Sequence, residues 1–473
     1  MPAQLTTRAQ VNGYRFLLRR LDHALVRRDI RMLHDPMRSQ ARSMVVGVVL
    51  GLLGLAGCAI LGFLRPVGAV DDAKIVVGKD SGVTYVIVEG HLHPVLNLAS
   101  ARLVAGSDES PTSVKESKLA SMPRGPLLGI PGAPAGLTGP AGGARSSWTL
   151  CETTVLSKSG SAVSSPGVIT TVSSAEPEPG DRSRPMRDDQ ALLVEYGGRI
   201  HLLYRGLRAE VDPNDPAVAR ALKLTPEHRP RPAGPGLLNA ALEVPPIAAP
   251  LIPQTGAPGP ATLVDHRIGE VIRGGGELYV IVAEGVQRVS EFTAQLLRNA
   301  NSLGAGEIPT VPPDVLNGVR VVNTLPVDRF PDVAPDIVAA EQMPVACLAW
   351  SRGEHDRLAR VGTLVGDALP MSESAEPVEP VSADGIGERV DGVYVPPMTG
   401  EFVQVTGIEP DSVRRQSLYY IGDNGVRYGI PDMATARILG LGDEPRLAPW
   451  PIVGGLIAGP ALEKAAALTA HDR

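Results

Sequence analysis

The feature that most constrains the fold is an uninterrupted apolar stretch near the N-terminus. Residues 44–64 read MVVGVVLGLLGLAGCAILGFL, with no charged residue and no proline. At about 1.5 Å per residue, a helix of this length reaches about 31 Å, and the hydrocarbon core of a bilayer is about 30 Å thick. A long helix buried in a soluble protein normally keeps some polar positions, which this stretch lacks. We therefore predict a membrane-spanning helix over residues 44–64.

The charges beside this span predict its orientation. Residues 1–43 contain nine arginines and three aspartates, a net charge of +6, whereas the whole chain carries −6. Basic residues next to a span remain in the cytoplasm. The N-terminus is therefore expected inside, and the large acidic C-terminal part outside.

A lipoprotein and a cleaved signal peptide are the two alternatives to a retained anchor. Residues 55–58 read LAGC, which fits a lipoprotein cleavage site with Cys58 as the acylated residue. However, the basic region before the apolar run is far longer than that of a signal peptide, and the run continues for six residues past the cysteine. We interpret LAGC as a coincidence of small apolar residues.

Three glycines in the span lie on one helical face. Gly47, Gly51 and Gly54 are spaced i, i+4 and i+7, so they form a strip of bare backbone. Such a strip suits close packing against another membrane helix. The alternative is that glycine is simply common in membrane helices.

Before the span, apolar residues recur at helical spacing between Val11 and Leu25, with arginines on the other faces. This pattern predicts a basic amphipathic helix that docks on a cytoplasmic partner. Anionic lipid of the inner leaflet is a second occupant, and fixing the topology is the simplest role. The residues expected to carry docking are Tyr14, Phe16, Leu18, Arg19, Arg20, Leu21, Arg27 and Arg28.

After the span the composition argues against one large core. The chain has 52 glycines and 44 prolines, and only 4% of its residues are aromatic. Short strand-like segments alternate with connectors rich in proline and glycine. This composition predicts several small units in series.

Internal similarity indicates what the units are. Residues 83–102 and 418–437 each contain a strand-like run, a glycine (Gly90 and Gly425), a second run, and an Ala-x-Ala-Arg motif that begins nine residues after the glycine. Weaker copies are residues 192–209 around Gly198 and 278–297 around Gly285. Each copy is expected to fold as strand, glycine turn, strand and short helix. We also expect copies one and four, and copies two and three, to form equivalent pairs.

The two cysteines outside the span have mirrored surroundings. Cys151 ends the segment WTLC and Cys347 begins the segment CLAW. Since disulfides persist outside the cytoplasm, we predict that the two pair and close a central domain built from two separate segments. The chain-closure model assigns such a long loop about 4–5 kcal/mol. Residues 157–179 and 372–384, which are of low complexity, are expected to be surface loops or linkers.

These observations predict an α+β protein with mostly short β-strands. A basic N-terminal helix and one transmembrane helix precede an elongated region of four small αβ repeats around a central β-rich domain. The expected divisions are 1–43 (cytoplasmic helix), 44–64 (span), 72–140 (repeat 1), 145–190 and 319–400 (central domain), 191–260 (repeat 2), 262–318 (repeat 3) and 401–473 (repeat 4).

No pattern in the chain predicts catalysis or a metal site. There is no G-x-x-x-x-G-K-[ST] phosphate loop, no G-x-S-x-G and no H-E-x-x-H. Gly274–Gly276 lies between strand-like runs and is expected to be a hairpin turn. His91 and His93 share a strand face but lack a third ligand at a recognisable spacing. Residues 212–216, DPNDP, are expected to cap a helix at 217–222, and the acidic C-terminal part argues against nucleic-acid binding.

Several of these segments together resemble one family. The N-terminal QVNGYRFLLRRLDHALVRRDIRMLHDPMR, the span, and LHPVLNLASARLV, RGPLLGIPGAP and GVRYGI are similar to the EccB family, a membrane component of mycobacterial type VII (ESX) secretion systems. The resemblance covers nearly the whole chain. It implies one inner-membrane span, a periplasmic part of four repeats around a disulfide-linked domain, and repeats akin to phage-lysin modules that bind cell walls.

The resemblance also implies partners and a function. It suggests a structural core component that scaffolds the periplasmic side of a complex with EccC, EccD, EccE and the mycosin protease, with self-association. The family is often labelled an ATPase, so ATP hydrolysis is the enzymatic alternative, although no nucleotide site can be named here and no cofactor is otherwise expected. A membrane-anchored protein that binds peptidoglycan is the third alternative.

Overall fold

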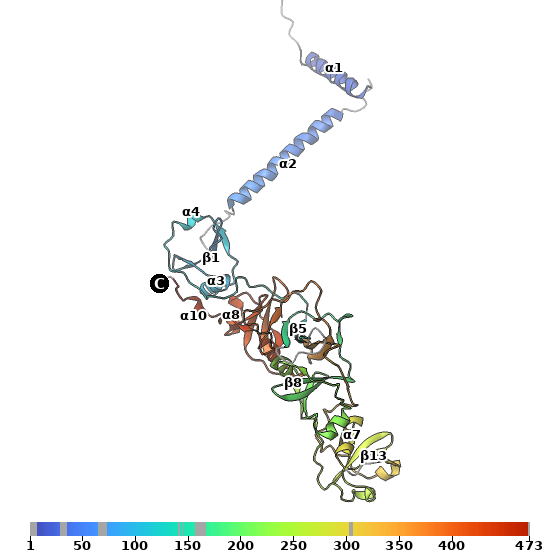
Figure 1. The fold of residues 1–473 in the computed structure, drawn as a ribbon. Coiled ribbons are helices and arrows are strands. Elements are labelled where there is room, and N and C mark those ends of the chain that lie inside the picture. The colour runs from blue at the N-terminus through green and yellow to red at the C-terminus, as the bar shows by residue number, and fades with distance from the viewer. Residues whose placement is uncertain are drawn as a thin grey trace, which may run out of the picture. The chain divides into compact units, whose positions relative to one another are not determined.

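The structure is a computed structural model with mixed α+β secondary structure and mostly short strands (Figure 1). It describes residues 7–28, 36–64, 73–140, 142–143, 145–156, 167–301 and 306–471. By their internal contacts the residues divide into two units, which are described separately. The first contains residues 1–72 and 113–115, and the second contains residues 73–112 and 116–473.

Within its described N-terminal residues, the first unit contains the helices α1 (Arg8–Arg27) and α2 (Pro36–Leu64). At the start of α1 the side chain of Gln10 accepts the backbone N–H of Thr7 at 3.0 Å. The helix ends where Arg28 adopts a left-handed conformation and donates its N–H to the carbonyl of Ala24. Helix α1 coincides with the predicted basic helix, and its apolar face is exposed.

Helix α2 contains the predicted span and begins eight residues before it. Within α2 the stretch Arg42–Ile60 has a mean hydropathy of 2.3, and among the described residues it is the one helix long and apolar enough to cross a membrane. The prediction of one apolar spanning helix is therefore confirmed at the level of length and composition.

The second unit is built on five sheets joined by short helices (Figure 1). Its helices are α3 (Leu98–Ala105), α4 (Glu116–Leu119), α5 (Pro216–Ala221), α6 (Pro235–Ala240), α7 (Glu291–Ala300), α8 (Met433–Ile438), α9 (Trp450–Val453) and α10 (Lys464–Ala467), with short 3-10 turns at Ala261–Leu263 and Pro313–Leu316.

A central sheet has the strand order β20-β6-β5-β18-β19-β7. Its strands are β5 (Arg145–Thr154), β6 (Val168–Ser173), β7 (Ser183–Pro185), β18 (Val345–Gly353), β19 (Arg360–Gly366) and β20 (Gly392–Tyr394). Strands β5 and β18 are antiparallel, in a register that pairs Cys151 with Cys347 and Trp148 with Trp350. The two cysteines form a disulfide. Antiparallel pairing is the physical reason for the mirrored motifs, because one strand reads in reverse against the other.

The remaining strands form four further sheets of four to six strands each, which we call the small sheets. They are β1 (Ile75–Gly78), β2 (Thr84–Val88), β3 (His91–Pro94) and β4 (Thr112–Val114); β8 (Gln190–Tyr196), β9 (Arg199–Tyr204), β10 (Leu207–Val211), β11 (Arg231–Pro232), β12 (Leu242–Glu243) and β17 (Asp336–Ile337); β13 (Val271–Gly274), β14 (Glu277–Val282), β15 (Gly285–Val289) and β16 (Thr310–Val311); and β21 (Gly400–Thr406), β22 (Leu418–Gly422), β23 (Val426–Ile430), β24 (Arg446–Pro449) and β25 (Ile457–Ala458).

Each small sheet contains three consecutive antiparallel strands followed by a short helix: β1-β2-β3 and α3, β8-β9-β10 and α5, β13-β14-β15 and α7, and β21-β22-β23 and α8. A polar side chain caps the start of each helix by accepting a backbone N–H. The capping residues are Asn97, Asp215, Ser290 and Asp432. The predicted cap within DPNDP and the predicted hairpin turn at Gly274–Gly276 are both present.

The predicted placement of the second copy is wrong by one hairpin. Gly198 lies in the turn between β8 and β9, and β9 is followed by another strand instead of a helix. The turn that precedes the helix is at Gly206, between β9 and β10. The matching Ala-x-Ala-Arg is Ala217–Arg220 in α5. It begins eleven residues after Gly206, so the nine-residue spacing of the first and fourth copies does not identify it.

One predicted loop is also wrong in part. Residues 157–166 lie outside the described residues, but Val168–Ser173 forms β6, a mostly buried strand of the central sheet. Threonine and valine have high β-propensity, and this favoured a strand over the loop that the low complexity suggested. Residues 372–384 contain no regular helix or strand.

The buried side chains form three main clusters. One joins residues between 75 and 130 to residues between 402 and 467, so the first and last small sheets share a core. A second joins residues between 191 and 252 to residues between 263 and 330, so the second and third sheets share another. The third covers the central sheet with α6, α9 and β21. The first and fourth, and the second and third, therefore pack as pairs.

Candidate functional site

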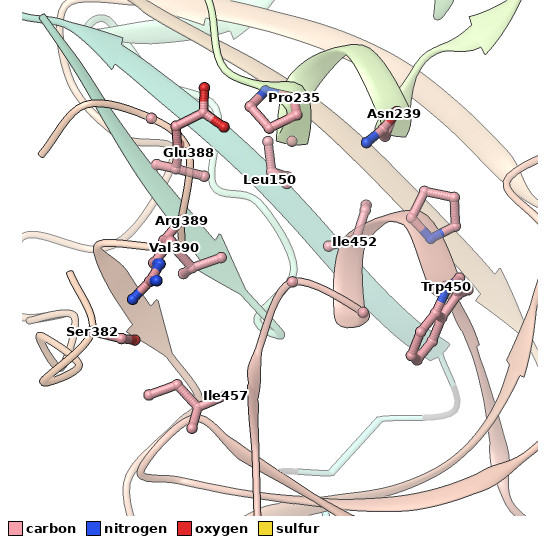
Figure 2. Close-up of a pocket in the computed structure, with 16 residues that line it drawn as sticks. Leu150, Pro235, Asn239, Ser382, Glu388, Arg389, Val390, Trp450, Ile452 and Ile457 are labelled. Carbon is pink, nitrogen blue, oxygen red and sulfur yellow. The ribbon is translucent and has the colours of Figure 1, made fainter. Parts of the chain in front are cut away.

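A cavity of about 690 Å³ lies over the central sheet, and we call it the central cavity (Figure 2). Five segments of the chain line it: β5, β6, α6, the loop 382–390, and α9 with the residues that follow it. The lining residues are Leu150, Thr170, Pro235, Gly236, Asn239, Ser382, Gly387, Glu388, Arg389, Val390, Trp450, Pro451, Ile452, Gly454, Gly455 and Ile457.

A buried carboxyl group holds the α6 wall. Glu152 extends from β5 and is 4% exposed. Its Oε2 accepts the N–H of Gly234 at 2.8 Å and its Oε1 accepts the N–H of Leu237 at 2.9 Å. Gly234 has no room for a side chain, because a Cβ there would collide with the carbonyl oxygen of Gly387. Glu152 therefore fixes the start of α6 against the central sheet.

Burial perturbs the titration of Glu152 and of a nearby arginine. Burial raises the pKa of Glu152 to about 8, and the two N–H donors and the guanidinium of Arg231 oppose that rise. Burial likewise lowers the pKa of Arg231 to about 10, against the attraction of Glu341 and Glu152. Because both oxygens of Glu152 are engaged by backbone N–H groups and the side chain is buried, this carboxyl group serves structure and is inaccessible as a general acid or base.

A second carboxylate holds the loop wall. Asp391 accepts the N–H of Thr170 at 2.9 Å through Oδ2, and those of Asp384 and Gly385 at 2.8 and 2.7 Å through Oδ1. The backbone N–H of Asp391 is donated to the carbonyl of Thr170 at 2.7 Å. Charge-assisted bonds of this kind are stronger than neutral ones, so the loop that follows Asp384 is anchored to β6.

An aromatic and cationic cluster holds the α9 wall. Trp450 stacks on Tyr419 with ring centroids 5.9 Å apart. The guanidinium carbon of Arg427 lies 5.1 Å from the centroid of Trp450 and 5.4 Å from that of Tyr419. Arg427 also donates its Nε–H to the carbonyl of Leu456 at 3.1 Å. These contacts fix the half-exposed indole of Trp450 in one orientation.

The floor of the cavity is apolar and its rim is polar. Figure 2 shows Leu150 and Ile452 between the walls, with Pro235 and Asn239 on one side and Glu388 and Arg389 on the other. Thr170 also lines the cavity, with its Oγ1 buried. An apolar site with a few polar groups is typical of ligand pockets. The arrangement is suited to binding and offers no nucleophile paired with a base.

The functional residues predicted from the sequence do not line the central cavity. Gly47, Gly51 and Gly54 lie in α2 with open space around their backbones. The exposed apolar residues of α1 include Tyr14, Phe16, Leu18 and Leu21. Arg19 and Arg20 are exposed on the same helix, and Arg28 caps its C-terminus. The side chain of Arg27 lies outside the described residues. Cys151 is adjacent to Glu152 in β5.

The histidines considered as metal ligands have other contacts. His91 and His93 hydrogen-bond through Nδ1 to the backbone carbonyls of Glu89 and Pro126. Within the described part of the chain, no group of three or more His, Cys, Asp or Glu residues could hold a metal ion.

The sequence reasoning missed the residues that build the cavity. A signal for Glu152 existed, because a lone carboxylate sits among apolar and hydroxyl residues in WTLCETTV. Asp391 and Trp450 stand in no pattern that distinguishes them from ordinary loop residues.

Comparison with known proteins gives a consistent set of similarities. A family model described as "Type VII secretion system ESX-1, transport TM domain B" matches residues 3–473. The ESX-1 secretion system ATPase EccB1 of Mycobacterium tuberculosis is 37% identical over 478 residues, which cover 100% of this chain and 96% of that protein.

Two solved structures share the fold. A chain of an intact ESX-5 inner membrane complex is 34% identical with a TM-score of 0.73, covering 100% of this chain and 97% of that one. The EccB3 dimer from the ESX-3 core complex is 33% identical with a TM-score of 0.72, covering 84% of this chain and 100% of that one.

Proposed function

The chain belongs to the EccB family of type VII secretion proteins, and we propose that it is a structural component of an ESX inner-membrane complex that scaffolds its periplasmic side. The observation that carries this proposal is the extent of the structural similarity, because the whole chain, and not one part of it, matches a chain of such a complex. The apolar helix α2 provides the membrane anchor that a component of this kind needs.

The internal architecture supports a scaffolding role. We propose that the four small sheets with their helices are repeats arranged around the central domain. The predicted boundaries are kept except at residues 319–337, which pack with the second and third sheets instead of the central one. Three consecutive strands, a capped helix and a glycine turn recur in each of them. The first and fourth sheets share one hydrophobic core, and the second and third share another. Because segments distant in the sequence stabilise each core, this arrangement suits a rigid scaffold.

The orientation proposed for the anchor places the N-terminus in the cytoplasm and the large C-terminal part in the periplasm. The excess of arginine before the span supports this orientation. Cysteines introduced singly at Asn12 and at Arg320 would test it in whole cells. We expect a maleimide that cannot cross the inner membrane to label the second but not the first, and the reverse pattern would overturn the proposal.

We propose EccC, EccD, EccE and a mycosin protease as partners. Native electrophoresis of gently solubilised membranes with an affinity-tagged copy is the direct test. The expected result is a very large species in which chains similar to these partners co-purify. A small species without partners would contradict the proposal.

We propose that the exposed apolar face of α1 docks on a cytoplasmic partner in that complex. Leu18 and Leu21 are 44% and 60% exposed. Replacing both with glutamate should remove the large species on the native gel while the chain remains in the membrane, because charge on this face costs the apolar contact. Asn12→Glu changes the polar face of the same helix and should leave the complex intact. Equal loss in both variants would contradict a specific docking face.

The glycine face of α2 is proposed to pack against another membrane helix. Apart from the backbone of α2 itself, no atom of the described residues lies within 4 Å of a Cβ added at Gly47 or Gly51, so leucine fits there without strain inside this chain. The double change Gly47→Leu and Gly51→Leu should therefore leave the amount of protein in the membrane unchanged and still weaken assembly on the native gel, because bulk prevents close backbone approach. Val49→Leu on the opposite face is the matched control, and unchanged assembly of the double variant would remove this role.

ATP hydrolysis is the second candidate function, and the reason to retain it is the word ATPase in the names of relatives such as EccB1. The sequence contains no phosphate loop. We expect the purified chain, free of partner proteins, to release no phosphate from ATP above the level of a buffer control. Turnover that follows the chain through purification would favour the enzymatic function.

A further inference from the structure

The first small sheet is extended by two segments beyond β3. Residues 124–128 run parallel to β3, since Leu128 donates its N–H to the carbonyl of Pro94 at 2.9 Å and accepts the N–H of Leu96 at 3.1 Å. Residues 469–471, which we call the edge strap, lie antiparallel to Leu128. A segment that follows the fourth small sheet therefore adds a strand to the first.

Hydrogen bonds to the backbone hold the edge strap in place. Gly129 donates its N–H to the carbonyl of Thr469 at 3.3 Å, and His471 donates its N–H to the carbonyl of Leu127 at 3.0 Å. The side chain of His471 adds a third bond, because its Nε2–H is donated to the carbonyl of Gly129 at 2.6 Å. These contacts recognise an extended backbone and depend little on the side chains of the strap.

A comparable segment in the other pair of small sheets is fixed more firmly. Strand β17 follows the third small sheet and pairs with β8 of the second, and its neighbours Phe330 and Val338 are buried in hydrophobic clusters. In contrast, the side chains of residues 468–471 are all exposed, and the buried side chain before them is Ala467. Segments with few buried apolar contacts open locally at a lower free energy than the whole fold. The edge strap is therefore the more easily released of the two.

We propose that the edge strap covers a strand-addition site on the first small sheet and exchanges there with the edge strap of a second molecule of this chain. An extended segment that adds a strand to a sheet edge gains its affinity from main-chain hydrogen bonds, which residues 127–129 supply. The edge strap is seated on this edge in register, and every molecule of the chain carries it. A second molecule is therefore a partner whose segment fits. Exchange of this kind does not depend on the partner proteins named in the proposed function.

The strap of the same molecule competes with that of a second one. A tethered segment acts at an effective concentration in the millimolar range, so exchange is expected to be rare while the edge is covered. Removing the strap deprives the N–H of Gly129 and the carbonyls of Leu127 and Gly129 of the bonds described above. A sheet edge with unpaired backbone groups is a template for pairing with another chain. Removal should therefore increase capture of a strap from a second molecule.

Cross-linking between two differently tagged molecules tests this exchange. Both carry Cys58→Ser, which removes the free thiol. The acceptor stops after Leu468 and carries Leu127→Cys, and the full-length donor carries His471→Cys, at the position whose N–H bonds to Leu127. The two are mixed in detergent with a short bis-maleimide, and the cross-linked pair is quantified on a denaturing gel. We expect about tenfold more of this pair than with an acceptor that keeps its strap.

Two proline variants of a full-length acceptor separate release of the strap from any effect of truncation. His471→Pro removes the N–H that bonds to Leu127 and should raise the yield of the pair. Ala470→Pro should not raise it, because the ladder uses the carbonyl of Thr469 and the N–H of His471. The urea unfolding midpoint of each acceptor should match that of the native chain, since the altered side chains are exposed.

A second control tests whether the pair reflects random collision. An acceptor with Arg320→Cys in place of Leu127→Cys carries its thiol at an exposed position remote in sequence from the edge, and it should give no pair. Equal yields from covered and uncovered acceptors, or a yield with Arg320→Cys as high as with Leu127→Cys, would overturn the proposal. Because this assay needs no partner proteins, its failure would leave the native-gel test of the proposed function standing.

Discussion

Replacing Glu152 with alanine is expected to destabilise the C-terminal part of the chain by about 2–6 kcal/mol. The two N–H groups of Gly234 and Leu237 that now donate to the carboxyl group would become buried and unpaired, and each such group costs about 1–3 kcal/mol. The measurement is unfolding of the full chain in detergent by urea, followed by the fluorescence of the buried Trp148 and Trp350.

Glu195→Ala is the matched control for this experiment. Glu195 is exposed on β8, so its loss should shift the free energy of unfolding by less than about 0.5 kcal/mol. Equal stability of the Glu152→Ala and Glu195→Ala variants would show that Glu152 does not hold α6.

The same residue predicts a pH dependence with a definite sign. The pKa of Glu152 rises from its ordinary value of 4.5 to about 8 in the folded chain, chiefly through burial. Between these values the folded state keeps a proton that the unfolded state has released. The contribution of Glu152 to stability is therefore fully present below pH 4.5 and is lost as the pH rises toward 8.

Glu152→Gln tests this pH dependence directly. Glutamine does not titrate, so the variant should lose the part of the slope between pH 4.5 and pH 8 that the carboxyl group supplies. It should also be less stable at low pH, because the amide can accept only one of the two N–H groups. An identical slope in the variant and the native chain would contradict the assignment.

Removing the disulfide is the second change with a large expected effect. The bridge joins Cys151 and Cys347, which are 196 positions apart in the sequence. The double change Cys151→Ser and Cys347→Ser should lower the free energy of unfolding by about 4–5 kcal/mol, mainly by freeing the unfolded chain. Urea unfolding of the oxidised and reduced chain measures the effect.

Cys58→Ser controls for the loss of a thiol as such. Cys58 is a free cysteine in α2, so its replacement should leave the urea midpoint of the C-terminal part unchanged. A double variant as stable as the oxidised native chain would show that the central sheet does not depend on the bridge.

Local signals in the sequence were sufficient for the span, the basic helix, the hairpin turn at Gly274–Gly276 and the helix cap within DPNDP. Each of these depends on residues within a few turns or one hairpin of one another. The mirrored cysteine motifs were also readable, because antiparallel pairing imposes a symmetry that survives a long separation along the chain.

Other features could not be read because their spacing or composition was ambiguous. The second copy was placed one hairpin too early, since two additional residues separate Gly206 from the helix motif of α5. The low complexity around β6 predicts a loop, but the β-propensity of valine and threonine and pairing with β5 make Val168–Ser173 a strand.

By itself, the sequence determined that this chain has one apolar span, an arginine-rich N-terminal helix, short strands and the family to which it belongs. The tertiary structure alone decided the central cavity. Its walls come from Glu152 in β5, α6, the loop before Asp391, and Trp450 in α9. The physical reason is that a lone buried carboxylate or a half-exposed tryptophan acquires its role from partners tens to hundreds of residues away, which no local pattern records.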